Sequence, residues 1–198
     1  MTRLSAFLPC LALVACVAED QTTILILHNV VPTEMCEIPA EEGSAFSSSG
    51  VLDIESGLQD YTFTPLLRSS AVGDPNDVNR RVVQIQGAET DLYGGASQQS
   101  VDLVNGLGDA LRFRETRVSG SLSPNGSVTS LHYTMIDLEQ ANALAAGVAG
   151  DARVQIVAST RVYGDMDGSR VESKFFDYPI TVCRGCVLVP GCFGDQTP

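Results

Sequence analysis

Residues 153–162 read Arg-Val-Gln-Ile-Val-Ala-Ser-Thr-Arg-Val, and this stretch decides the class of fold. Apolar side chains at Val154, Ile156, Ala158 and Val162 alternate with polar ones. A period of two residues places one set of side chains on each face of an extended chain, so the pattern predicts a half-buried β-strand. Further strand-like segments lie at residues 22–31, 51–54, 61–67, 82–88, 111–122, 130–135 and 170–182. The chain is therefore expected to be rich in β-structure.

Turn-forming residues separate these segments. Ser123-Pro124-Asn125-Gly126 supplies a proline for the first corner of a turn and an Asn-Gly pair for positive φ. This composition predicts a hairpin whose return strand places Leu131, Tyr133 and Met135 inward. A second polar hairpin turn is expected at residues 164–168.

One helix is expected, over Asp137–Gly147. Asp137 can cap its first turn, and Gln140 stands three residues later, as in a capping box. Residues 94–100 are polar and contain glycine, so they are expected to form a loop.

These patterns predict an all-β fold in a single domain over residues 23–198. Many short strands with turns about every ten residues favour an antiparallel β-sandwich, immunoglobulin-like, with one short helix. A small β-barrel is the alternative architecture. The length of this part of the chain suits one hydrophobic core and does not require a second domain.

The cysteines of this domain are candidates for disulfides: Cys36, Cys183, Cys186 and Cys192. Four cysteines in an oxidising compartment allow three connectivities. We expect Cys36 to pair with the C-terminal group and so to tie the two ends of the domain together. The spacing of Cys183 and Cys186 is also that of thiol–disulfide redox sites, but the sequence Val187–Gly191 after it does not favour the helix that activates such a pair.

The first residues have the form of a secretory signal. Arg3 is followed by an apolar run over residues 4–15, which is too short to span a bilayer as a helix. The stretch Leu13-Val14-Ala15-Cys16 resembles the lipobox of bacterial lipoproteins. This resemblance implies that residues 1–15 are removed as a lipoprotein signal peptide and that Cys16 carries the lipid. Residues 16–22 would then form a short lipid-anchored tether.

The resemblance also implies a location. Lipoproteins of this kind are sorted by the residues after the lipid-bearing cysteine, and Val17 and Ala18 favour the outer membrane over retention in the inner one. The membrane is thus an expected partner, reached through the N-terminal lipid. The block Tyr178–Cys186 is loosely similar to uncharacterised myxobacterial envelope lipoproteins that end in a C-x-G-C, a resemblance that implies no activity.

The remaining chemistry of the sequence argues for a structural or binding role. The net charge of −12 disfavours nucleic acid as a partner. We find no G-x-S-x-G, H-E-x-x-H or P-loop pattern, and the acidic turn at residues 165–168 does not continue as an EF-hand. We therefore expect no catalytic residues, no cofactor and no metal site. The expected binding elements are the loops at 69–81 and 93–100, which would face a protein or glycan partner; the alternative function is envelope redox chemistry at the C-x-x-C.

Overall fold

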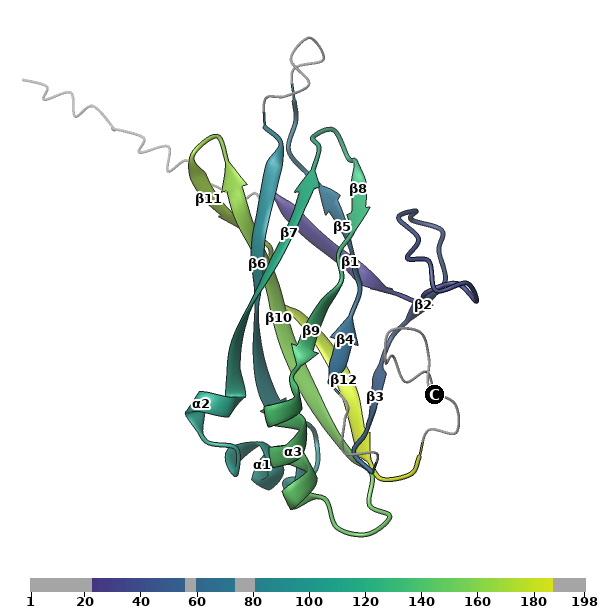
Figure 1. The fold of residues 1–198 in the computed structure, drawn as a ribbon. Coiled ribbons are helices and arrows are strands. Elements are labelled where there is room, and N and C mark those ends of the chain that lie inside the picture. Colours follow the sequence, from purple (N-terminus) through teal and green to yellow (C-terminus); the bar gives the residue numbers. More distant parts are fainter. Residues whose placement is uncertain (1–22, 56–59, 74–80, 187–198) are drawn as a thin grey trace, which may run out of the picture.

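The computed structural model describes residues 23–55, 60–73 and 81–186, and this part of the chain is mostly β, as the sequence predicts (Figure 1). The first strands are β1 (Ile24–Val30), β2 (Phe46–Ser47), β3 (Gly50–Asp53), β4 (Tyr61–Phe63), β5 (Pro65–Ser69) and β6 (Val83–Gly94). The middle of the chain forms α1 (Gln98–Asn105), α2 (Asp109–Arg112), β7 (Phe113–Leu122), β8 (Val128–Ser130) and β9 (Tyr133–Ile136). The last elements are α3 (Leu138–Gly147), β10 (Val154–Met166), β11 (Ser169–Glu172) and β12 (Phe176–Cys183).

Two curled sheets enclose the core. One has the order β2-β1-β5-β8, and the other has the order β3-β12-β10-β6-β7, with β11 paired to β10. A small third sheet, β4-β9, lies beside them. All pairs are antiparallel except β12 with β3, which is parallel. The expected antiparallel sandwich is therefore present with one parallel pair at an edge.

Two contacts link the sheets to one another along the sides of the sandwich. On one side, Ile24 of β1 forms a bridge with Ser173, next to β11. On the other side, the Thr116 hydroxyl of β7 donates to the carbonyl of Thr134 in β9 over 3.1 Å. The β-rich arrangement is therefore consistent with the expected sandwich and with the barrel-like alternative.

The prediction that the strands on either side of residues 123–126 pair as a hairpin is wrong, although the turn itself forms. Asn125 and Gly126 have φ values of 65° and 76°, as an Asn-Gly turn requires. However, β8 leaves β7 and pairs with β5, where Ser130 lies opposite Leu66. Leu131 and Tyr133 are inward-facing, as predicted, and burying them between the sheets draws this segment to the other layer.

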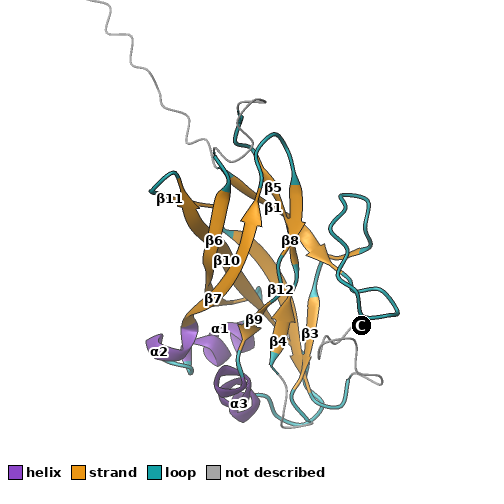
Figure 2. Ribbon diagram, turned by 45° about the horizontal axis from the view of Figure 1, so that its top comes forward, coloured by secondary structure: helices purple, strands orange, loops and turns teal. Residues whose placement is uncertain are grey.

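The predicted helix is confirmed as α3, with both hydrogen bonds of a capping box between Asp137 and Gln140. The expectation of a single helix and of a loop at 94–100 is wrong, because α1 begins at Gln98 and α2 follows it. Ser97 caps α1, and a Cβ at Gly94 would collide with the backbone of Val101, so only glycine permits this close approach of helix and sheet. The three helices gather at one end of the sheets (Figure 2).

No helix within the described residues combines the length and the apolar character needed to cross a membrane.

A cluster of hydroxyl groups lies in the core against β10. Thr160 is fully buried, and its hydroxyl lies 2.8 Å from the Tyr133 hydroxyl and 3.1 Å from that of Thr90. Thr160 also donates to the backbone carbonyl of Glu89 over 3.0 Å. Buried polar groups are costly unless they are hydrogen-bonded, so this cluster joins β9 to β10 and β6 in one arrangement. Burial raises the pKa of the Tyr133 phenol well above its usual value.

The Tyr133 phenol predicts a specific pH dependence of stability. The unfolded chain ionises this group near pH 10, whereas the folded protein resists ionisation, so the free energy of unfolding falls as the pH rises above 10. In Tyr133→Phe this contribution is absent, and the fall becomes shallower by up to about 1.4 kcal/mol per pH unit. Urea denaturation from pH 7 to 11 measures it. The two proteins should run parallel below pH 9, and parallel curves above pH 10 would contradict the assignment.

Candidate ligand-binding site

The outer face of the six-stranded sheet carries the main candidate site. Residues of β10 alternate between core and exterior, and Val157, Ser159 and Arg161 point outward. Their neighbours on β6 are Tyr93, Asp91 and Glu89, and the β12 residues opposite Val157 and Ser159 are Pro179 and Asp177. Strands adjacent in a sheet lie about 4.8 Å apart, so Asp91 and Asp177 flank Ser159 at a backbone separation of about 10 Å.

A cavity of about 510 Å³ opens at this position. It is lined by Tyr93, Gly94, Val157, Ser159, Phe175 and Asp177. Its size lies within the range of small-molecule sites, and its composition of aromatic and aliphatic walls with a few polar groups is typical of them. Tyr93 and Phe175 are 44% and 55% exposed, so part of each ring is accessible at the cavity.

Hydrogen bonds fix the carboxylates of this cavity. The hydroxyl of Ser159, which is only 6% exposed, donates to Oδ1 of Asp177 over 2.5 Å. On the other side of Ser159, the hydrogen bond to Asp91 raises the pKa of the Tyr93 phenol. Within the described part of the chain, neither Asp91 nor Asp177 forms an ion pair. Asp177 in the cavity and Asp91 beside it thus carry negative charge that no ion pair among the described residues balances.

Guanidinium groups border both aromatic rings. Arg161 lies over the ring of Phe175, with its central carbon 5.0 Å from the ring centroid, and Arg112 lies 5.9 Å from that of Tyr93. These distances are within the range of cation–π attraction. The rings at the cavity are therefore placed where cations already contact aromatic faces.

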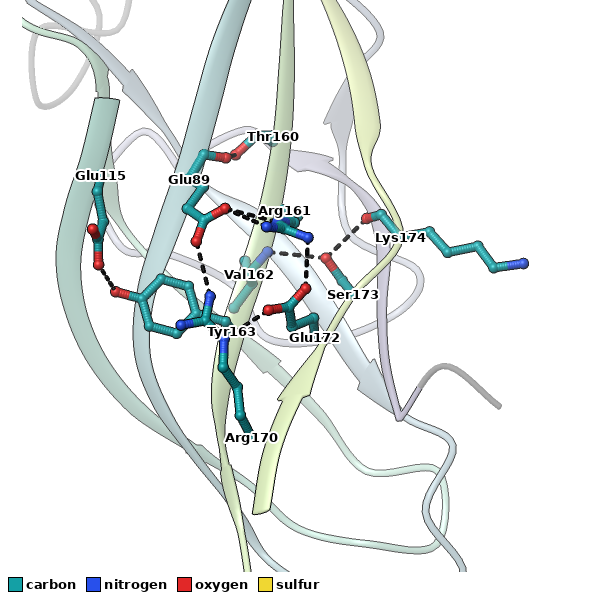
Figure 3. A network of polar contacts seen from close by, with 10 residues as sticks. All are labelled: Glu89, Glu115, Thr160, Arg161, Val162, Tyr163, Arg170, Glu172, Ser173 and Lys174. Atoms are coloured by element: carbon teal, nitrogen blue, oxygen red, sulfur yellow. Dashed lines mark hydrogen bonds and ion pairs between the residues drawn. The ribbon is translucent and has the colours of Figure 1, made fainter. Parts of the chain in front are cut away.

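Next to the cavity, the same sheet face carries a closed ring of ion pairs (Figure 3). Arg161 bridges Glu89 and Glu172 at 2.7 and 2.6 Å, and Arg170 bridges the same two carboxylates at 2.8 and 2.6 Å. Each carboxylate thus contacts two guanidinium groups. The ring neutralises its own charge and fixes Arg161 at the cavity edge.

The network of contacts extends from the ion-pair ring to Tyr163, two residues beyond Arg161 on β10. Arg170 lies 4.2 Å from the centroid of the Tyr163 ring, and the Tyr163 hydroxyl donates to Glu115 of β7. This hydrogen bond raises the pKa of the Tyr163 phenol. The contacts join β7, β10 and β11 across the outer face and stiffen the sheet beside the cavity.

The C-x-x-C lies at the end of β12, far from the cavity lining. Cys183 and Cys186, two of the disulfide candidates, form a disulfide with their Cα atoms 6.0 Å apart. The peptide N–H of Gly185 donates to Asp53 over 2.8 Å, and Arg184 donates to the carbonyls of Ala145 and Val148 at the end of α3. The loop thus joins β12 to β3 and α3.

The other predicted sites are only partly described. Cys36 takes part in a disulfide, whereas Cys16 and Cys192 lie outside the described residues. Of the expected binding loops, residues 74–80 also lie outside, and Tyr93 and Gly94 line the cavity. In the described ranges, no group of three or more histidine, cysteine or acidic side chains is arranged to hold a metal ion.

Sequence reasoning missed the cavity itself. The alternation of polar and apolar residues indicates only that Asp91, Ser159 and Asp177 lie on the outward-facing side of their strands. They become neighbours because β10 lies between β6 and β12, and strand order is not visible in the alternation.

The ion-pair ring predicts an unequal cost for two arginine substitutions. Arg161→Met removes two contacts from Glu89, whose side chain is 11% exposed, and should lower the free energy of unfolding by about 1–3 kcal/mol. Arg68→Met, which breaks an exposed pair with Glu42, should cost at most about 1 kcal/mol. Chemical denaturation compares the two, and equal effects would show that the ring contributes no more than a surface pair.

No protein-family model matches the chain, and no curated protein matches it.

Proposed function

We propose that this chain is a lipid-anchored protein of the bacterial cell envelope that binds a ligand at the outer face of its six-stranded sheet and catalyses no reaction. The observation that carries the binding role is the cavity at Tyr93, Ser159 and Asp177, where aromatic rings are partly exposed and Asp177 forms no ion pair among the described residues. Exposed aromatic surface and unpaired charge each lower the stability of a folded domain, so a ligand that contacts both offers a reason for keeping them.

The anchor is supported by the pattern Leu13-Val14-Ala15-Cys16 after a charged and then apolar start. Each buried methylene of an acyl chain contributes about 0.8 kcal/mol, so two or three chains hold a protein on a bilayer stably. Eight peptide steps separate Cys16 from Ile24, and a fully extended chain of that length reaches at most about 29 Å. The domain would remain close to the membrane.

The site chemistry favours binding over catalysis. Of the two histidines, His28 lies in the four-stranded sheet beside Phe46, with ring centroids 5.1 Å apart, and His132 lies near Thr64. Neither lines the cavity. A hydroxyl nucleophile such as that of Ser159 would need a base, and its only hydrogen-bond partner within the described residues is Asp177, which it serves as donor.

The second candidate function is thiol–disulfide exchange at Cys183 and Cys186, and the disulfide itself is the observation in its favour. Redox-active pairs of this spacing have an accessible first cysteine at a helix N-terminus. Cys183 instead ends a strand and is 1% exposed. Its environment supports a structural disulfide.

Lipidation predicts a clear effect of one substitution. Cys16→Ala removes the acylated thiol and should move the protein from the detergent-rich to the aqueous phase of a detergent partition. The natural protein should begin at a diacylated or triacylated cysteine by mass spectrometry. Cys10→Ala is the matched control and should behave as the natural protein, because Cys10 lies within the segment that is removed. An unmodified N-terminus, or membrane association that survives Cys16→Ala, would refute the anchor.

A thiol titration distinguishes a structural role of the Cys183–Cys186 disulfide from a redox role. If the disulfide is structural, the oxidised native protein should expose no free thiol and should resist a mild dithiol until it is unfolded, because the Cys183 sulfur is shielded. Mapping of the alkylated peptides identifies which pair opens. Rapid reduction of Cys183–Cys186 in the native state would favour the redox function.

A further inference from the structure

The carboxylates of the ion-pair ring and those at the cavity differ in charge balance, and this difference indicates the charge of the ligand that the cavity binds. In the ring, Glu89 and Glu172 are each matched by two guanidinium groups. Two residue pairs further along β6 and β10, on the same face, Ser159 stands between Asp91 and Asp177, and neither carboxylate forms an ion pair among the described residues. The excess negative charge on this part of the sheet is thus located at the cavity.

The geometry of the carboxylates suits a cation that donates hydrogen bonds. The Ser159 hydroxyl occupies Oδ1 of Asp177 and orients the carboxylate, while Oδ2 has no hydrogen-bond partner within the described residues. A hydrogen bond between an ionised donor and a carboxylate is about twice as strong as one between neutral groups. A cation at this position would also relieve the repulsion between two like charges flanking Ser159, which a neutral ligand cannot do.

The walls of the cavity suit an organic cation in particular. The rings of Tyr93 and Phe175 already lie beside the guanidinium groups of Arg112 and Arg161, which shows that cations are accommodated against them, and Val157 and Gly94 offer apolar contact to a hydrocarbon stem. A bare metal ion is a poorer fit, because the described residues do not gather three ligands for it. An anion would meet uncompensated carboxylates, which disfavour it.

We infer that the cavity at Tyr93, Ser159, Phe175 and Asp177 binds an alkylammonium group, with Asp177 as its anionic partner, Asp91 as a second negative charge beside the cavity, and the two aromatic rings as its walls. This inference rests on the proposed binding function and specifies its ligand class. The same group occurs on free aliphatic amines and at the end of lysine-like side chains, and the cavity chemistry is common to both.

The test measures binding of defined probes to the detergent-solubilised full-length protein by calorimetry. Cadaverine represents a free amine, and Nα-acetyl-lysine methylamide represents a lysine-like side chain. Pentanol and glucose are the neutral probes, and pentanoate is the anionic one. We expect one of the amines to bind at least tenfold more tightly than the neutral and anionic probes, and to bind more weakly as the ionic strength rises. Whichever amine binds more tightly identifies the source.

Three variants locate the site. Asp177→Asn keeps an acceptor for Ser159 but removes the charge, and it should weaken amine binding at least tenfold. Tyr93→Ala removes one wall and should also weaken it. Glu37→Gln is the matched control, because it removes the same charge from an exposed residue near β2 and should leave binding unchanged. Circular dichroism and the unfolding midpoint show whether each variant is folded.

The outcomes separate this inference from the function on which it rests. Tighter binding of pentanol, glucose or pentanoate would overturn the alkylammonium assignment while supporting a binding role. Amine binding that is insensitive to Asp177→Asn and Tyr93→Ala would place the amine elsewhere and overturn the assignment. Absence of binding by every probe would overturn both the assignment and the binding role, while the anchor is judged separately from the partition of Cys16→Ala.

Discussion

The register of β10 between β6 and β12 is the constraint on which both the core and the outer face depend. Side chains of a strand alternate between faces, so a slip of one residue would turn Ser159 and Arg161 into the core and expose Ala158 and Thr160. The Thr160 hydroxyl opposes such a slip, because it makes buried hydrogen bonds with Tyr133 and with β6. A buried hydroxyl cluster on one face thus fixes the position of every charged group on the other.

The same register explains why the charges of the outer face are balanced in one place and unbalanced in the next. Arg161 lies opposite Glu89, and the hairpin of β10 and β11 places Glu172 opposite Tyr163 and Arg170 opposite Asp165, from where their side chains reach Arg161 and Glu89. One row further on, the residues on both sides of Ser159 are aspartates. Local choices in natural sequences generally agree with the fold, and departures from that agreement concentrate at functional sites. The unbalanced row coincides with the cavity, and this coincidence is the physical basis of the proposed binding role.

Local sequence patterns predicted where strands and helices form, but they did not predict which elements lie next to each other in the fold. The alternation around Val154 and the capping box at Asp137 and Gln140 depend on nearby residues alone, and both were correct. The turn at Asn125-Gly126 also formed, but turn chemistry fixes only the local reversal, and the burial of Leu131 decided which sheet received the returning chain. Helix α1 was missed because its sequence is largely polar and buries only Ser100, Leu103 and Val104. The cavity was missed for a related reason, since its residues come from separate strands whose order the alternation does not encode.

The disulfide and the N-terminal sequence pattern are two independent features, and each is compatible with the proposed location in the bacterial cell envelope. Disulfides persist in oxidising compartments such as the bacterial envelope, and the bond between Cys183 and Cys186 belongs to the folded domain rather than to the N-terminal segment. An anchor before Ile24 would lie at the end of the domain where β1 meets Ser173, away from the helices (Figures 1 and 2). The strands that carry the cavity run along the axis between these two ends, so the cavity lies on the side of the domain. An anchored protein would therefore present its binding face laterally, open to the surrounding envelope space instead of pressed against the lipid.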